Sequence, residues 1–220
     1  MHILVLGGTG AAGQLLIQEA LSLHHSIAVL ARSPQKLPET IRNHPQVTVI
    51  EGGLTDEEII DKALEGVDAV VSALGPAVKK GPFHPPNTPL AHGYQLVIRL
   101  MKKNGVKRLI ALGTASMKDE HDKFSLIFKT LVTGVAVFAR NAYNDVVAIG
   151  DVIRGEGADL LWTIARVPIL TDDPKRDVVA GYIGEGVVKP YLSRAGFAAF
   201  VIEQIDATEW LQKAPLVSSP

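Results

Sequence analysis

The sequence contains no cysteine among its 220 residues. This absence excludes disulfide bonds, zinc sites built on thiolates and a cysteine nucleophile, and it is compatible with a reducing compartment. An apolar run begins at Ile3, which leaves no room before it for a signal peptide. We therefore expect a cytoplasmic protein.

An excess of charge and a long apolar run are also missing. The formal net charge is −1 and the pI is about 6.7, so the chain has no basic field that would attract nucleic acid or an anionic membrane. No apolar run reaches the roughly 18 residues of a membrane span. We expect a small-molecule substrate, no nucleic-acid, membrane or metal partner, and a monomer or homodimer.

The most informative feature that is present is a glycine-rich turn near the N-terminus. Ile3–Leu6 is typical of a buried parallel strand, and apolar residues recur at helical spacing from Ala11 to Leu23. The turn between them contains Gly7, Gly8, Gly10 and Gly13. Glycines allow a tight turn and a close approach to a pyrophosphate, whose negative charge the helix N-terminus stabilises. The alternative is a turn that only packs the helix against the strand.

The spacing of Gly7, Gly10 and Gly13 resembles that of the short-chain dehydrogenase/reductase superfamily. The wording G-G-T-G-A-A-G is similar to its extended and atypical branch, the NmrA-like NAD(P)H-binding group. The resemblance implies an α/β fold, a doubly wound, Rossmann-like parallel sheet in a single domain spanning 1–220, with small C-terminal elements on the substrate side. The expected cofactor contacts in the turn are Gly7, Thr9, Gly10, Ala11, Ala12 and Gly13.

Arg32 indicates which cofactor is bound. It follows the second expected strand, Ser26–Ala31, where a carboxylate would hydrogen-bond the free 2′-hydroxyl of NAD(H) and an arginine would accommodate the 2′-phosphate of NADP(H). No acidic residue occurs from 26 to 38. We predict NADP(H), held by Arg32 with Ser33 and Lys36 beside it; the alternative is a solvent-exposed arginine.

The rest of the chain alternates between expected strands and helices, as a doubly wound sheet requires. Helix starts and stops follow from capping residues and glycines; Thr55 or Asp56 can cap one helix and Ser193 a late one. The expected strands are 47–50, 68–73, 107–112 and 213–218, and the expected helices are 56–64, 88–103 and 140–154.

The resemblance implies further cofactor contacts. Ala73, Leu74 and Gly75 match the family's turn beneath the adenine ribose, and Leu54 follows the position where many relatives carry an aspartate, here Gly53. A later stretch resembles the loop that covers the nicotinamide in the family, although Val167 separates its usual Arg-Pro pair. Its candidate residues are Arg166, Pro168 and Ile169.

The catalytic candidates are Thr114, Ser116 and Tyr143, and Thr114 is also an expected cofactor contact. In the superfamily a serine or threonine after the fifth strand hydrogen-bonds the substrate carbonyl, and a tyrosine donates the proton with a lysine four residues later. Thr114 and Ser116 match the first element, with a hydroxyl bonded only to the loop backbone as the alternative. Tyr143 lies near the tyrosine position, but Val147 stands where the lysine would be.

Two other stretches have no assigned chemistry. Residues 75–89 contain five prolines and two glycines, which indicates a functional loop beside the pocket. We expect His84 within it, and His92 after it, to be surface or loop residues. Phe124–Phe138 is apolar nearly all round, which favours a buried helix, a lid over an apolar substrate or a dimer surface. We rank a place in the core or in the pocket wall above a dimer surface.

The sequence therefore favours an NADP(H)-dependent reductase of the atypical short-chain kind that transfers hydride to a small, largely apolar carbonyl or conjugated substrate. Two alternatives remain. One is a non-enzymatic NADP(H)-sensing regulator of the NmrA-like kind, favoured by the missing lysine. The other is a redox-neutral isomerase or cyclase on the same fold.

Overall fold

A computed structural model describes residues 1–76 and 83–220. Its largest sheet contains the strands β1 (His2–Leu6), β2 (Ser26–Ala31), β3 (Val47–Glu51), β4 (Ala69–Ser72), β5 (Arg108–Thr114), β6 (Leu161–Val167), β8 (Val179–Gly181) and β10 (Leu216–Ser218). Their order across the sheet is β3-β2-β1-β4-β5-β6-β10-β8. All neighbours run parallel except β10 and β8. The predicted doubly wound, Rossmann-like α/β fold is confirmed.

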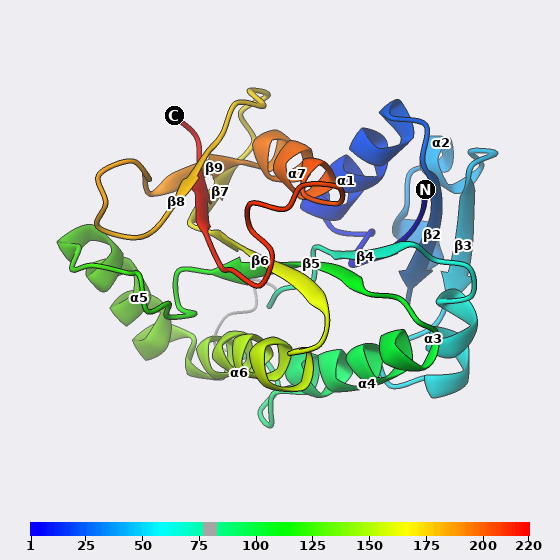
Figure 1. Cartoon of the computed structure of the whole chain (residues 1–220), viewed down its shortest axis with the longest axis horizontal. Helices are drawn as coiled ribbons and strands as arrows, with labels where there is room; N and C mark the ends of the chain where they lie inside the picture. Colours follow the sequence, from blue (N-terminus) through cyan, green and yellow to red (C-terminus); the bar gives the residue numbers. More distant parts are fainter. Residues whose placement is uncertain (77–82) are drawn as a thin grey trace.

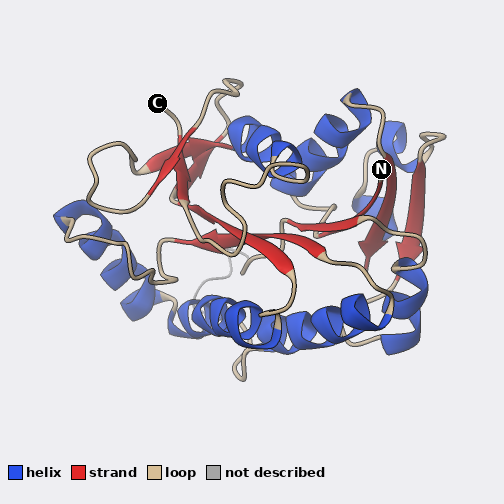
Figure 2. Cartoon of the chain, viewed as in Figure 1, coloured by secondary structure: helices blue, strands red, loops and turns tan. Residues whose placement is uncertain are grey.

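Helices cover both faces of this sheet (Figures 1 and 2). In chain order they are α1 (Ala11–Ser22), α2 (Glu39–Arg42), α3 (Glu57–Ala63), α4 (Pro89–Lys103), α5 (Leu126–Phe138), α6 (Arg140–Glu156) and α7 (Arg194–Glu203). Helices α1 and α7 lie against one face, and α4 and α6 lie against the other (Figure 1).

Each face of the sheet has its own apolar core because the central strands are buried on both sides. In β1, Ile3 and Val5 belong to the core beneath α1 and α7, whereas Leu4 and Leu6 belong to the core beneath α4 and α6. Side chains alternate between the faces of a strand, so a strand covered on both sides needs a continuous apolar run. This explains why the apolar composition of residues 3–6 predicts a buried strand.

The register of the strands brings their carboxyl ends to one edge. Leu6 at the end of β1 pairs with Leu30 of β2 and with Ser72 of β4. The glycine turn, Arg32 and Ala73 each follow one of these strand ends. In open parallel sheets, ligands bind at this edge, where the order of the strands reverses.

Small elements lie near the C-terminus. The strands β7 (Ile169–Thr171) and β9 (Tyr191–Ser193) form a separate parallel pair. The Ser193 hydroxyl accepts a hydrogen bond from the Gly196 N–H at 2.8 Å, which confirms Ser193 as the cap of α7. The expected final strand is β10.

The interpretation of 124–138 as a buried helix is wrong. Most of the segment forms α5, but Phe128 is the only buried residue of this helix. Phe128 contacts Ile183 and Leu216 beneath the sheet's edge, while most other apolar side chains of α5 are exposed. Hydrophobicity predicted the helix correctly and its burial incorrectly.

The expected loop between Gly75 and Pro89 is described only in part, since residues 77–82 lie outside the described residues. Among the helices that the structure does describe, none has the length and apolar character to cross a membrane.

Candidate functional site

The glycine turn needs glycine for two kinds of reason. Gly7 has φ of +77°, which other residues rarely adopt, and a Cβ on Gly13 would lie 2.2 Å from the Gly7 carbonyl oxygen. Gly10 is different, because it has extended backbone angles and a Cβ there would meet only the Gly7 oxygen, at 3.5 Å. The fold itself therefore does not require glycine at position 10, whereas the close approach of a ligand would.

The turn leads into an uncapped helix. Helix α1 begins after Gly10 with no side-chain cap and no acidic residue in its first turn. Its first N–H groups and the positive end of its dipole are therefore available to an anion. The Gln14 side chain donates to the Thr9 carbonyl oxygen at 3.2 Å, which braces the turn from within the helix. Sequence reasoning missed this hydrogen bond, because a single glutamine that belongs to no recognised motif gives no signal in the sequence.

Arg32 is exposed directly after β2. A Cβ on Gly53 would lie 3.8 Å from both Cγ and Cδ of Arg32, so the arginine stem passes beside the exit of β3. Within the described residues, its guanidinium takes part in no hydrogen bond or ion pair. The Asp56 carboxylate accepts a hydrogen bond from the Gly53 N–H at 2.6 Å instead of capping α3. The guanidinium is therefore accessible to an anionic group at this edge.

The predicted residues after β4 also lie at this edge. A Cβ on Gly7 would be 3.0 Å from the Ala73 carbonyl carbon and from the Leu74 nitrogen, so the two turns touch. Leu54 packs against Gly93 of α4, with a Cβ there only 2.8 Å from that of Leu54. The structure thus brings Leu54 and 73–75 to the same end of the sheet as the glycine turn.

Ser116 and Tyr143 line one cavity of about 260 Å³. Its other lining residues are Met117, Lys118, Val147, Asp151 and Arg154. Ser116 comes from the loop after β5 and Tyr143 from the first turns of α6, so the fold joins two of the three catalytic candidates. Sequence reasoning missed Lys118, which also lines this cavity. Val147, the residue at the family's lysine position, lines the cavity as well.

Thr114 is placed differently from the other two candidates. Its hydroxyl oxygen accepts a hydrogen bond from the Ser116 N–H at 3.1 Å, and Thr114 is not among the residues that line the cavity. This matches the alternative in which the hydroxyl is satisfied by the loop backbone. Thr114 therefore shapes the turn that presents Ser116.

The expectation that the Arg166 side chain helps to position the nicotinamide is corrected by the structure. Arg166 is fully buried, and its guanidinium donates to the carbonyl oxygens of Ala214 and Met117 at 2.6 and 2.9 Å. It also donates to both carboxylate oxygens of Asp122, at 2.6 and 2.8 Å. No face of the guanidinium is left for a ligand, so Arg166 anchors the loop after β5.

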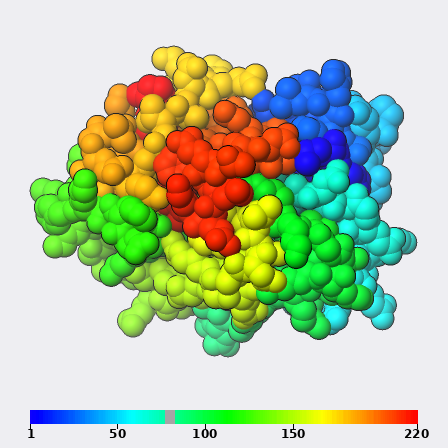
Figure 3. All heavy atoms as spheres, viewed as in Figure 1, coloured from blue at the N-terminus to red at the C-terminus, as the bar shows by residue number. Residues whose placement is uncertain are grey.

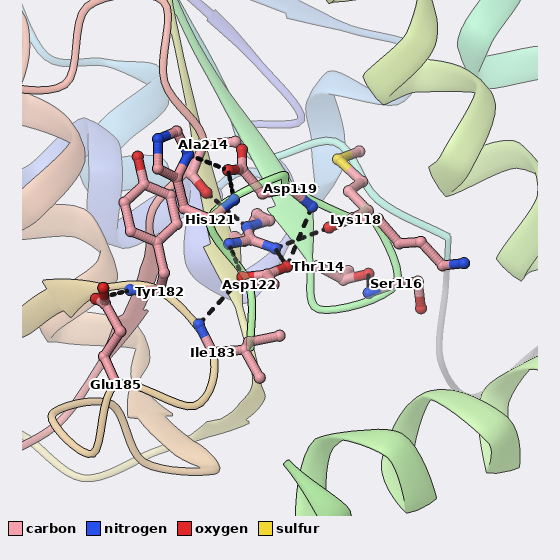
Figure 4. Close-up of polar contacts among 12 residues, drawn as sticks. Thr114, Ser116, Lys118, Asp119, His121, Asp122, Tyr182, Ile183, Glu185 and Ala214 are labelled. Carbon is pink, nitrogen blue, oxygen red and sulfur yellow. Dashed lines mark hydrogen bonds and ion pairs between the residues drawn. The ribbon is translucent and has the colours of Figure 1, made fainter. Parts of the chain in front are cut away.

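Asp122 is the centre of this anchor (Figure 4). Besides Arg166, it accepts hydrogen bonds from the N–H groups of Ile183 and Asp119, both at 3.1 Å. Burial alone raises the pKa of the Asp122 carboxyl, but the hydrogen bonds and charge of Arg166 outweigh it, so the net pKa lies below its ordinary value. The loop carrying Ser116 is thus fixed by an ionised carboxylate.

Pro168 and Ile169 follow β6 at the same edge. Val167 pairs with Thr114 across the β5 and β6 ends, which sets Pro168 next to the loop after β5. Ile169 is exposed, and its N–H donates to the Pro190 carbonyl oxygen at 3.1 Å. Both residues remain near the site, whereas the arginine before them points into the core.

His84 lies in a loop as expected, but its side chain is not a surface one. Its Nε2 is 2.7 Å from a carboxylate oxygen of Asp145, which is fully buried on α6. Asp145 also accepts from the N–H groups of Leu90 and Ala91, at 3.1 and 2.9 Å, and so caps α4 from a neighbouring helix. The exposed His92 agrees with the prediction.

Taken together, the fold and the edge of the sheet define a dinucleotide-binding α/β protein of the Rossmann type. Residues 7–208 match the family described as NAD(P)H-binding, and the chain belongs to this family. It is a reductase-like family, which agrees with the resemblance seen in the glycine turn.

Curated relatives agree with this assignment, and solved structures agree with the fold. An isoflavone reductase homolog from Solanum tuberosum is 30% identical over 99% of this chain and 68% of that protein. The chain covers only part of its curated relatives, from 18% of one, a 3 beta-hydroxysteroid dehydrogenase/Delta 5-->4-isomerase from Mycobacterium tuberculosis, to 70% of another, an isoflavone reductase from Medicago sativa. Among solved structures, a short-chain dehydrogenase/reductase from Veillonella parvula in complex with NADP has a TM-score of 0.80 at 18% identity, covering 100% of this chain and 94% of that one. An anaerobillin reductase from Escherichia coli O157:H7 has a TM-score of 0.77 at 17% identity, covering 100% and 98%.

Proposed function

We propose that this chain is an NADP(H)-dependent reductase that transfers hydride to a small carbonyl or conjugated substrate in the cavity shared by Ser116 and Tyr143. The single observation that carries the proposal is this shared cavity, which Ser116 lines from the loop after β5 and Tyr143 from the first turns of α6. The reductases among the relatives support the class of reaction. A cytoplasmic location and a monomeric or homodimeric state belong to the same proposal.

The cofactor would lie across the carboxyl edge of the sheet. Gly7, Gly10 and Gly13 with the start of α1 bind the pyrophosphate, and Arg32 binds the 2′-phosphate of NADP(H). The relative solved with NADP supports this choice of cofactor. When bound, the reduced nicotinamide supplies the hydride.

The residues of the cavity act on the substrate. The backbone N–H of Ser116 donates to the Thr114 hydroxyl oxygen, which fixes the position of Ser116. The Ser116 hydroxyl donates a hydrogen bond to the substrate oxygen. The Tyr143 phenol delivers the proton that accompanies hydride transfer. Met117 and Val147 offer apolar contact, and Lys118 brings a cation to the same cavity from the loop.

Steady-state oxidation of NADPH with a panel of aldehydes, ketones and enones tests this proposal. Ser116→Ala and Tyr143→Phe should each lower kcat/KM by about a hundredfold, as is typical for one lost acid–base or hydrogen-bonding group. Tyr191→Phe is the matched control, because Tyr191 is exposed on β9 and outside the cavity. The proposal is wrong if NADPH binds but no substrate in the panel oxidises it.

A second candidate, a sensor of the cofactor without turnover, is favoured by two observations. Val147 stands at the family's lysine position in the cavity, and the Arg166 side chain is committed to the core. A sensor would bind without chemistry and report the cofactor to a partner. Similar affinities for NADP⁺ and NADPH, together with no turnover and a partner recovered by pull-down, would favour it over the reductase.

A further inference from the structure

Helix α5 with the residues on either side of it, residues 123–140, presents a concentrated apolar surface. Six of the thirteen large apolar side chains exposed in the described part of the chain lie in it. They are Phe124, Leu126, Ile127, Val135, Val137 and Phe138. An apolar surface gathered on one segment indicates a binding surface, because single scattered residues are the norm elsewhere.

The segment lies at one end of the molecule. Helix α5 extends beyond the sheet at the left of the view in Figure 1, and its side chains form the left margin of the space-filling view in Figure 3. Its one fully buried side chain, Phe128, joins it to Ile183 and Leu216. The exposed phenylalanines, Phe124 at 76% and Phe138 at 77%, mark its two ends. A large flat surface could therefore reach the segment without steric hindrance from the sheet.

All charges in this segment have one sign. Residues 123–144 contain Lys123, Lys129 and Arg140 and no acidic residue. Within the described residues, none of the three takes part in an ion pair, although Lys129 lies 5.8 Å from the centre of the Phe124 ring. The net charge of −1 for the whole chain led to the expectation of no membrane partner. A net charge does not reveal a cationic surface on one segment, because acidic residues elsewhere in the chain offset it.

We propose that the segment 123–140 binds the surface of an anionic lipid bilayer, with α5 lying in the interface. A helix that lies in the membrane interface requires exposed apolar side chains flanked by lysine and arginine. The apolar side chains enter the boundary of the acyl chains, and the basic side chains contact the lipid phosphates. A second copy of the chain, docked segment to segment, would meet the same positive charges and offer no counter-charge. The charge of the segment therefore favours lipid over self-association.

The basic test is sedimentation of the full chain with vesicles. Vesicles of phosphatidylcholine alone are compared with vesicles of an equal mixture of phosphatidylcholine and phosphatidylserine. The chain should sediment with the mixed vesicles, much less with the neutral ones, and less as salt is raised, since salt screens the surface potential. Equal binding to both vesicle types, or binding to neither, would overturn the proposal.

Variants separate the two contributions. Neutralising all three charges as Lys123→Gln, Lys129→Gln and Arg140→Gln should weaken binding to the mixed vesicles on the order of a hundredfold, about fivefold for each charge. Replacing both phenylalanines, as Phe124→Ser with Phe138→Ser, should reduce binding by at least about tenfold.

Lys107→Gln and Leu23→Ser are the matched controls, since both residues are exposed and lie outside the segment. These controls should bind vesicles as the unchanged chain does. Thermal unfolding of every variant shows whether the fold is intact, and NADPH binding, measured separately, should be unchanged throughout. If the controls weaken vesicle binding as much as the segment variants do, the segment is not the lipid site.

Light scattering of the free protein covers the remaining outcome. If the chain is a stable dimer that the two phenylalanine substitutions dissociate, and it does not bind the mixed vesicles, the surface is a self-association site and the lipid proposal is wrong. A monomer, or a dimer that the substitutions leave intact, together with anionic-vesicle binding supports the proposal. The reductase activity is not used in any arm, so its absence would leave this test unaffected.

Discussion

The glycine turn and the loop after β5 lie at the same edge of the sheet, but they are held in different ways. The turn is shaped by backbone contacts between neighbouring residues, such as the Gly10 N–H bond to the Gly7 oxygen at 3.1 Å. The loop after β5 is held by side chains from distant segments, above all the bond between Arg166 and Asp122, 44 positions apart. The glycine turn is therefore built locally, whereas the loop that carries Ser116 depends on the rest of the fold.

Among the variants that separate these two regions, Arg166→Met should have the largest effect, which is a loss of stability. It would leave the Asp122 carboxylate without its buried partner, and removing one member of a buried ion pair costs about 3–5 kcal/mol of unfolding free energy. For a chain of this size, the melting temperature should fall by about 10 °C. Thermal unfolding by circular dichroism measures it.

A second variant shows whether the stranded charge is the reason. Adding Asp122→Asn to Arg166→Met removes the uncompensated carboxylate, so the double variant should regain part of the lost stability. A double variant no more stable than Arg166→Met alone would contradict this explanation. A melting temperature of Arg166→Met equal to that of the unchanged chain would show that the anchor is dispensable.

Gly10→Val should have the opposite pattern, with cofactor affinity lost and the fold kept. Gly10 has φ of −80° and ψ of 161°, which valine readily adopts, and a Cβ there meets almost nothing in the protein. The side chain would fill space that a pyrophosphate needs, so NADPH affinity should fall by about a hundredfold, about 2.7 kcal/mol. Fluorescence titration measures the Kd.

Gly155→Val is the matched control, because a Cβ on Gly155 also meets nothing within 4 Å and this glycine lies on α6, away from the turn. It should leave the Kd unchanged. If Gly10→Val binds NADPH as tightly as the control does, the turn packs the helix only, as the structural alternative holds.

The same contrast explains what could be predicted from the sequence. The strands β1 and β2 and the turn between 7 and 13 depend on neighbouring residues, so composition and spacing were sufficient. The exposure of α5 could not be predicted, because an apolar helix has the same sequence pattern whether the rest of its own chain or something outside the chain covers it. The burial of Arg166 depends on Asp122, for which no motif exists.

The cavity lies between these two cases. Ser116 and Tyr143 were identifiable through their resemblance to family positions, whereas Lys118, Asp151 and Arg154 line the cavity without any such signal. The cap of α4 by Asp145 was equally hidden, since the acidic residue is 54 and 55 positions away from the two N–H groups that it satisfies. Side chains that act across long separations become visible only in the fold.

Arg32→Ser tests the adenosine end of the cofactor side, with a smaller effect. A 2′-phosphate would lose a charged partner, so the affinity for NADPH should fall by about tenfold to thirtyfold, while the affinity for NADH should hardly change. The ratio of the two Kd values is the measurement. Arg42→Ser is the matched control, because Arg42 is a basic residue on α2 that pairs with Glu39. Equal losses for both cofactors would mean that Arg32 does not distinguish them.

The smallest expected effect is the pH dependence of the Asp122 anchor. The pKa of this carboxyl in the folded chain is below the ordinary value of 3.8 that it has when unfolded. The folded chain thus binds the proton less readily, so the stabilisation is complete above the ordinary pKa and disappears as pH falls through the folded pKa. The melting temperature of the unchanged chain should therefore decrease more steeply in acid than that of Asp122→Asn, which is less stable at neutral pH.

The glycine turn provides the internal contrast for this last measurement. No residue from Leu6 to Gly13 carries an ionisable side chain, so the affinity for NAD⁺, the acid-stable form of the cofactor, should change little as the pH falls from neutral into the mildly acidic range. Parallel melting curves for the unchanged chain and Asp122→Asn would mean that the ion pair adds no stability. An NAD⁺ affinity that fell together with the melting temperature at a pH where the adenine ring is still unprotonated would mean that the two sides of the site are coupled, because neither the turn nor the cofactor has a group that titrates there.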